Sequence, residues 1–207
     1  GAMVAGLAGT VTVHAEEQKT YNIGICQLVQ HEALDAATQG FEDAVKEGLG
    51  EENVTFDEQN AQGDVTIANT IANKFVTDKV DLIFSIATPT TQAAVNATSS
   101  IPIIFTAVTD PEAAGLIKPN VTGSSDRVDN VAEQLDVLKE LNPNATTIGV
   151  LYNSSEQNSV TQVELIKKVA AEKGIKVEEQ AVTAVSELTQ ALDNLLSKAD
   201  ALYIPTD

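Results

Sequence analysis

The chain has 207 residues, of which 43% are hydrophobic, enough for one large domain or two small ones with their own cores. Its 30 acidic residues outnumber the 12 basic ones and give a formal net charge of −18. Such a surface repels nucleic-acid phosphates and anionic lipid headgroups, so we expect no nucleic-acid partner and no membrane insertion of the folded domain. One cysteine, Cys26, and two histidines, His14 and His31, provide no disulfide and no Cys/His metal spacing, and we expect neither metal nor cofactor.

Residues 1–19 read as a tag scar followed by a signal-peptide remnant or a tail. The stretch from Met3 to Ala15 is small and apolar, and its end, Val13-His14-Ala15, fits a signal-peptidase cleavage site. A positively charged start and a cysteine for lipid attachment are both missing from it. The pattern predicts an exported protein, periplasmic or cell-surface; the alternative is a disordered tag.

From Tyr21 onwards, short buried runs alternate with segments whose apolar residues recur every three or four positions. In chain order, the first series predicts a strand at 21–29, a helix at 32–49, a strand at 54–60, a helix from Asp64 to 76, a strand at 80–86, a helix at 88–98, and strands at 101–108 and 121–124. The second series predicts a helix at 128–138, a strand at 147–152, a helix at 156–173, a strand at 175–182, a helix at 185–199 and a strand at 201–205.

Single helices between strands predict an α/β protein with doubly wound parallel sheets. The two series resemble each other, with Asn22-Ile23-Gly24-Ile25 matched by Thr147-Ile148-Gly149-Val150 in the first strand of each. We therefore expect two Rossmann-like lobes, an N-terminal lobe at 20–126 and a C-terminal lobe at 127–207. Only three strands are expected in the second lobe, which suggests that it is truncated.

Ligands of such sheets bind at the carboxyl ends of the strands, so the residues that follow each strand are the candidates. After the third strand, Thr88 suits the N-cap of a helix and Pro89 its first position. The first turn then offers backbone N–H groups, the positive end of the helix dipole and the hydroxyls of Thr90 and Thr91. This combination suits a carboxylate, although an ordinary helix cap would look the same.

Polar residues also follow the other strands. Ser154 or Ser155 is expected to cap its helix, and Asp110, Glu156 or Asp207 could provide a counter-charge for an ammonium group. The remaining candidates for the ligand site are Gln30, His31, Thr106, Val108, Asn153 and Asn158. His31 could equally be a solvated residue at a helix start, and Asp110-Pro111 a simple turn.

The motifs of common enzymes are missing from the sequence. It contains no G-x-S-x-G, no glycine-rich phosphate loop and no G-x-G-x-x-G. No spacing singles out a pair of carboxylates for acid–base chemistry. We expect a binding protein rather than an enzyme.

Four blocks of sequence resemble a known family. They are ATPTTQAA (87–94), IPIIFTAVTDP (101–111), NVTGSSD (120–126) and GVLYNSSEQNS (149–159). Their order and content are similar to those of the ABC-transporter substrate-binding proteins, a family that includes the tryptophan-binding lipoproteins. The resemblance extends from about Tyr21 to Asp207.

This resemblance implies a type I periplasmic-binding-protein fold, whose two lobes close on an amino acid, often an aromatic one such as tryptophan or phenylalanine. It also implies an ABC permease and its ATPase as partners. By analogy, the turn at 88–91 holds the ligand carboxylate, Thr106 and Val108 line the first lobe, 153–158 line the second, and Asp207 meets the ammonium. The family's chains continue further than this one, and its lipoproteins carry a cysteine that is missing here. A sugar or nucleoside binder of the same fold remains the alternative.

Overall fold

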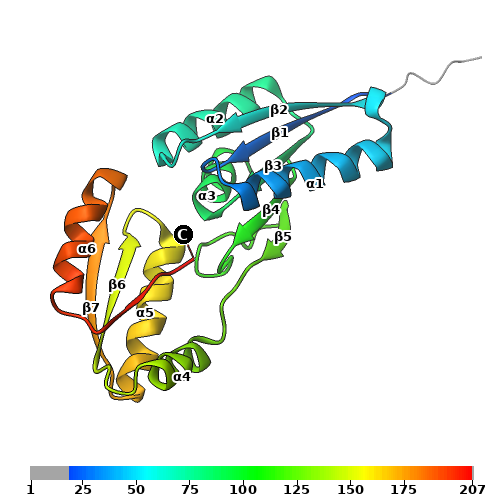
Figure 1. Cartoon of the computed structure of the whole chain (residues 1–207). Helices are drawn as coiled ribbons and strands as arrows, with labels where there is room; N and C mark the ends of the chain where they lie inside the picture. The colour runs from blue at the N-terminus through cyan, green and yellow to red at the C-terminus, as the bar shows by residue number, and fades with distance from the viewer. Residues whose placement is uncertain (1–18, 207) are drawn as a thin grey trace, which may run out of the picture.

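The computed structural model describes residues 19–206. The predicted tag and signal-peptide remnant at 1–18 and the predicted ligand residue Asp207 therefore lie outside the described residues. The first sheet is parallel, with strand order β2-β1-β3-β4-β5 (Figure 1). Its strands are β1 (Tyr21–Gln27), β2 (Val54–Asn60), β3 (Leu82–Ile86), β4 (Ile103–Val108) and β5 (Val121–Ser125). Helix α1 (Glu32–Leu49) packs on one face, and α2 (Val65–Asp78) and α3 (Thr88–Ala97) pack on the other. A short 3-10 turn, η1 (Glu51–Asn53), precedes β2.

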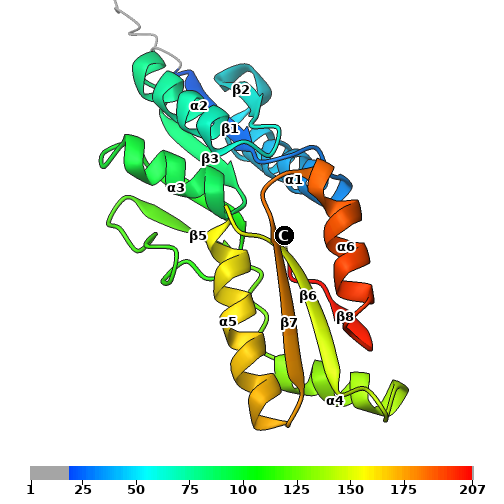
Figure 2. The same cartoon turned by 90° about the vertical axis from the view of Figure 1, so that its left-hand side faces the viewer.

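The second sheet is also parallel, with strand order β7-β6-β8 (Figure 2). It contains β6 (Thr147–Asn153), β7 (Lys176–Val182) and β8 (Ala201–Tyr203). Helices α4 (Val131–Leu141) and α5 (Gln157–Glu172) share a core on one face of it, and α6 (Leu188–Leu196), which follows the 3-10 turn η2 (Val185–Glu187), covers the other. We call the parts built on the two sheets the first lobe and the second lobe; the chain crosses between them at 126–130.

The predicted fold class, two lobes with doubly wound parallel sheets, is confirmed. Element ends differ from the prediction by a few residues. Strand β3 begins at Leu82 rather than at 80, because Val80 is buried in the core and Asp81 accepts a hydrogen bond from the backbone of Asn22 at 2.8 Å. None of the helices in the described part of the chain is both long and apolar enough to cross a membrane.

The core of the first lobe uses the one cysteine as a small apolar residue. Cys26 is 3% exposed within the cluster that packs against α2 and α3. Burial raises the pKa of its thiol to about 12, so the group stays protonated and unreactive at neutral pH.

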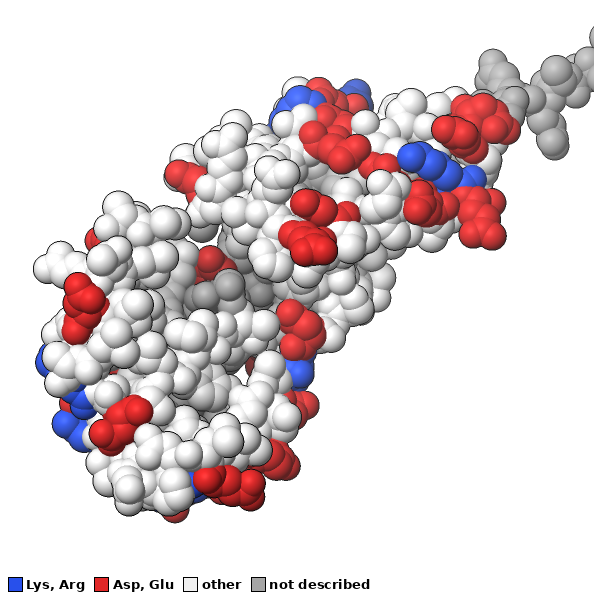
Figure 3. All heavy atoms as spheres, in the orientation of Figure 1, with Lys and Arg blue, Asp and Glu red and all other residues white. Residues whose placement is uncertain are grey.

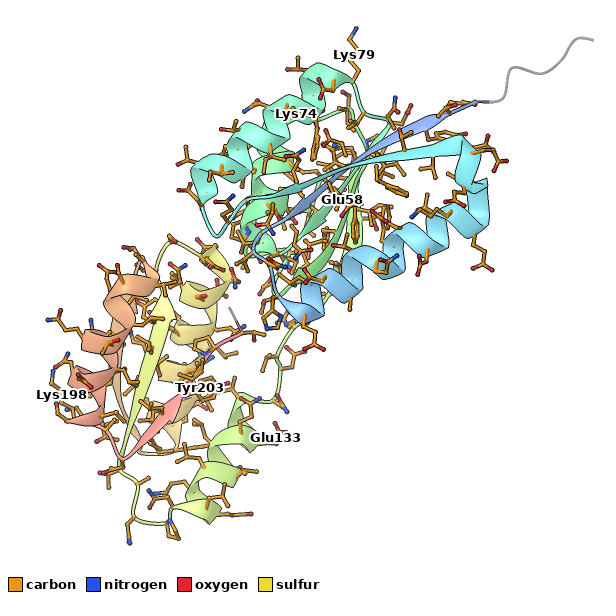
Figure 4. All side chains as sticks on the ribbon, turned by 45° about the horizontal axis from the view of Figure 1, so that its top comes forward. Glu58, Lys74, Lys79, Glu133, Lys198 and Tyr203 are labelled. Carbon is orange, nitrogen blue, oxygen red and sulfur yellow. The ribbon has the colours of Figure 1, made fainter. Side chains whose placement is uncertain are left out.

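Two carboxyl groups meet under α1. Glu42 of α1 is 7% exposed and pairs with Lys46 at 3.2 Å, but its Oε1 has no hydrogen-bond partner among the described residues. Glu58, labelled in Figure 4, comes from β2. The contact with the Glu42 carboxyl, and then burial, raise the pKa of Glu58. When both groups are ionised, the two carboxylates repel each other, whereas a proton on Glu58 would supply the donor that Glu42 lacks.

Replacing Glu58→Gln should therefore stabilise the protein near neutral pH. A raised pKa in the folded state means that the Glu58 contribution is fully present below its unfolded pKa and is lost as the pH rises through the folded value. At a pH above the folded pKa of Glu58, the wild type should thus melt at a lower temperature than the variant. At lower pH, the two melting temperatures should approach each other. Thermal melts over pH 4 to 8 measure this, with the exposed Glu47→Gln on α1 as control. If the variant is less stable than the wild type at neutral pH, the Glu42 and Glu58 carboxylates do not repel each other in the folded protein.

Candidate functional site

The two lobes meet where α3 and α5 begin. Helix α3 follows the carboxyl end of β3, and α5 follows the carboxyl end of β6. The two helices are in contact across the lobes, and Figure 2 shows the start of α5 beside that of α3. The end of the described chain, after β8, reaches the same place (Figure 1). Residues from the carboxyl edges of both sheets are thus brought together.

The turn into α3 has an unusual backbone. Ala87 has φ 85° and ψ 161°, and Ala107, at the end of the adjacent strand β4, has φ 53°. Both conformations are uncommon for a residue with a Cβ and cost about 1–3 kcal/mol each. The N–H of Ala87 donates to the carbonyl of Thr106 at 3.0 Å, which ties the two strained positions together. Strain of this kind gathers at functional sites more often than elsewhere.

The prediction that Thr88 is the N-cap of this helix is wrong. Ala87 occupies the cap position, Thr88 is the first helical residue and Pro89 the second. The reason is that the positive φ of Ala87 turns the strand directly into the helix, and its carbonyl accepts the N–H of Thr91 at 3.2 Å. No side chain caps the helix.

The three threonines of the turn have different roles. The hydroxyl of Thr90 donates to the carbonyls of Ile86 at 2.7 Å and Ala87 at 2.9 Å. The hydroxyl of Thr91 donates to Ala87 at 2.8 Å and lies 2.8 Å from that of Ser85. These two side chains hold the turn itself. Thr88 is 1% exposed, and its Oγ1 is buried without a hydrogen-bond partner among the described residues.

The polar run before α5 is largely used to build its own turn. Glu156, rather than Ser154 or Ser155, occupies the N-cap position. The Oδ1 of Asn153 accepts from the backbone of Ser155 at 3.0 Å and its Nδ2 donates to Glu156 at 3.0 Å, while the hydroxyl of Ser154 donates to Val182 at 3.4 Å. The predicted serine cap is wrong because the Ser154 hydroxyl binds Val182 and the Ser155 hydroxyl donates to Asn153 Oδ1 at 2.7 Å.

Asn158, in the first turn of α5, is the exception. It is 7% exposed, and its Nδ2 donates to the carbonyl of Thr206 at 3.2 Å. Its Oδ1 is buried and has no partner in the part of the chain that the structure describes. Gln162, one turn further on, also binds Thr206, and sequence reasoning missed it. The only signal was its spacing of four residues from Asn158, which puts both on one face of the helix.

The remaining candidates lie in other settings. His31 is exposed at the N-cap of α1, where its Nδ1 accepts the N–H of Ala33 at 3.2 Å, and the neighbouring Gln30 is exposed beside a polar cavity of about 290 Å³ in the first lobe. The hydroxyl of Thr106 lies 3.0 Å from that of Ser124.

The side chains of Val108 and Asp110 both contact other residues of the protein. Val108 is fully buried in a cluster with Phe105 and Leu116. Asp110 accepts the N–H of Ala113 at 2.9 Å and lies 4.0 Å from Arg127, so its charge already has partners.

One large cavity opens beside the contact between Gln162 and Thr206, since both residues line it. It is an open groove of about 560 Å³ on the second lobe, with Val137, Leu141 and Leu202 among its apolar residues. Tyr203, labelled in Figure 4, belongs to this groove and donates its hydroxyl to Gln134 of α4.

We also considered the distribution of charged side chains and the groups that could bind a metal ion. Acidic side chains are scattered over both lobes, with fewer basic ones between them (Figure 3). Within residues 19–206, no group of three or more His, Cys, Asp or Glu side chains could hold a metal ion.

Comparison with known proteins identifies the family. The model of the family described as ABC transporter substrate binding protein matches residues 22–207. A "Tyrosine-binding protein" from Clostridioides difficile is 46% identical over 200 residues, which are 93% of this chain and 58% of that protein. The chain thus spans less than two thirds of this curated relative.

Two solved structures are also similar. One, from Streptococcus pneumoniae, is an ABC domain in complex with L-Trp, with 38% identity and a TM-score of 0.84 over 91% of this chain and 66% of that one. The other is the ligand-free, open structure of a substrate-binding protein with adhesive properties from Clostridium difficile, with 48% identity and a TM-score of 0.60 over 91% and 66%. Together with the two parallel sheets, these likenesses show the type I periplasmic-binding-protein fold. The chain belongs to the family of ABC transporter substrate binding proteins.

Proposed function

We propose that the protein is the extracytoplasmic binding component of an ABC importer, and that it holds a free aromatic amino acid between its lobes for a permease and its ATPase. One observation carries the proposal. Thr88 Oγ1 and Asn158 Oδ1, at the starts of helices from opposite lobes, are both buried and lack partners among the described residues. Buried polar atoms are nearly always hydrogen-bonded, so two exceptions at one meeting point indicate a place for a ligand.

The chemistry of the two groups complements an α-amino acid. The Thr88 hydroxyl can donate to a carboxylate, as can the N–H groups in the first turn of α3, which have no acceptor within the helix. The positive end of the helix dipole favours the same negative group. The Oδ1 of Asn158 can only accept, which suits the ammonium. A zwitterion therefore gives a hydrogen-bond partner to Thr88 in the first lobe and to Asn158 in the second. The hydroxyl, the N–H groups and the helix dipole bind its carboxylate without an arginine.

The relatives support both the ligand class and the arrangement of the lobes. One relative is named as a tyrosine-binding protein, and one solved structure contains L-Trp. The present structure matches that complex with a TM-score of 0.84 but the ligand-free, open structure with only 0.60, although the open protein is more similar in sequence, at 48% identity against 38%. The lobes thus lie closer to the arrangement of the complex. A family of binding proteins also favours transport over catalysis.

Calorimetric titration of the chain with L-tryptophan, L-tyrosine and L-phenylalanine tests the proposal. We expect saturable binding of at least one of them, and none of ribose or adenosine, which represent the sugar and nucleoside ligands of the same fold. Binding of ribose or adenosine alone would replace the proposal by the sugar or nucleoside alternative. Binding of no amino acid would refute it.

A further inference from the structure

Thr206 is held by two side chains of α5. Its N–H donates to Gln162 Oε1 at 2.9 Å, its hydroxyl lies 2.8 Å from Gln162 Nε2, and its carbonyl accepts from Asn158 Nδ2 at 3.2 Å. Every polar group of Thr206 is thereby bound to α5. Gln162 is 5% exposed, and its carbonyl and amide groups are both used in this contact.

We infer that Gln162 and Thr206 are positioning residues that fix the amide of Asn158, and that they thereby make the site select an α-amino acid over the matching α-hydroxy acid. The inference rests on the proposed function and adds to it the group by which the ligand is recognised. It depends on the orientation of one amide.

The hydrogen bonds assign that orientation. A backbone carbonyl can only accept, so the Nδ2 of Asn158 must face Thr206. The opposite orientation would place two acceptors, Asn158 Oδ1 and the Thr206 carbonyl, against each other. Oδ1 therefore points away from Thr206, where it is buried and has no partner among the described residues. As long as Thr206 stays in place, Asn158 presents only an acceptor.

An acceptor without a partner discriminates between ligands by what they donate. An ammonium offers three charged donors, whereas a hydroxyl at the same carbon offers one neutral donor. Hydrogen bonds from a charged donor are about twice as strong as neutral ones. The preference for the amine thus comes from Asn158, and it lasts only while the amide cannot turn over.

Gln162 is what keeps the carbonyl of Thr206 in place. Thr206 follows β8 in a stretch without regular secondary structure, in which Ile204 is 60% exposed and Pro205 is buried. Without the two contacts to Gln162, the carbonyl would be free to shift and the Asn158 amide to turn. The Nδ2 group, now facing the ligand, would donate to a hydroxyl oxygen and repel an ammonium.

The test compares two ligands that differ at one group. The dissociation constants of L-tyrosine and of L-3-(4-hydroxyphenyl)lactic acid are measured by calorimetry for the wild type and for Gln162→Leu. We expect the wild type to prefer the amino acid, and the ratio of the two constants to fall by about tenfold in the variant, as for the loss of one hydrogen bond to a charged group. Thr206→Val, which keeps the backbone groups and loses only the hydroxyl, should lower the ratio less. Lys168→Leu, exposed on the same helix, is the control and should leave it unchanged.

Each outcome decides a different question. An equal loss of affinity for both ligands in Gln162→Leu would mean that the residue only supports the fold, and would overturn the inference. The same holds if the wild type binds both ligands equally, or if the ratio is unchanged in the variant. If the wild type binds neither tyrosine nor another aromatic amino acid, the proposed function itself fails. Circular dichroism confirms that each variant is folded.

Discussion

Replacing Thr88→Val should weaken the binding of an aromatic amino acid by a factor of about ten to one hundred, because a hydrogen bond to a charged group contributes about 1.5–3 kcal/mol. Valine has nearly the shape of threonine, so the change removes the hydroxyl without leaving a cavity. The hydroxyl has no partner in the described structure, so its loss should leave the unfolding free energy unchanged or slightly higher. Calorimetry and urea unfolding measure the two effects.

The ligand itself provides the control for this prediction. Tyrosinamide lacks the carboxylate, so its affinity should fall much less in Thr88→Val than that of tyrosine. Thr70→Val, an exposed threonine on α2, should change neither affinity. If tyrosine and tyrosinamide lose affinity equally, Thr88 does not bind the carboxylate.

Replacing Phe75→Ala should have the largest effect on stability, a loss of about 3–5 kcal/mol in the unfolding free energy. Phe75 is fully buried between α2 and the first sheet, and its ring fills the space above Gly24. A Cβ at position 24 would lie 2.7 Å from that ring. Urea unfolding followed by circular dichroism measures the loss, and Thr77→Ala, exposed on the same helix, is the control.

The close contact between Gly24 and Phe75 allows a second test, by substitution at Gly24. Gly24→Ala alone should be destabilising, since the new methyl group meets the ring. In combination with Phe75→Leu, part of the cost should disappear, because the smaller side chain makes room. Strictly additive effects of the two substitutions would show that the close contact does not limit position 24.

The sequence predicted the fold well because its buried strands and amphipathic helices are separated by clear turn residues. Helix 32–49 and strand 54–60 begin and end where expected. The N-cap of α3 was misplaced by one residue, since nothing in the sequence signals that Ala87 adopts a positive φ. A threonine before a proline normally suggests a cap, and only the bonds of Thr90 and Thr91 to the Ala87 carbonyl show otherwise.

The site was harder to predict than the fold. Thr88 and Asn158 were among the candidates because they begin helices at the carboxyl ends of strands. Their neighbours looked equivalent in the sequence, and only the hydrogen bonds separate Thr90 and Thr91, which hold a turn, from Thr88. The role of Gln162 depends on Thr206, 44 residues away, and such long-range pairs leave no local pattern.

A crystal structure of the chain with bound L-tyrosine or L-tryptophan tests the central claim most directly. We expect the ligand carboxylate within hydrogen-bonding distance of Thr88 Oγ1 and the first turn of α3, with the ammonium on Asn158 Oδ1. A ligand found elsewhere, for example in the apolar groove between α4 and β8, with both atoms still unpartnered, would contradict it.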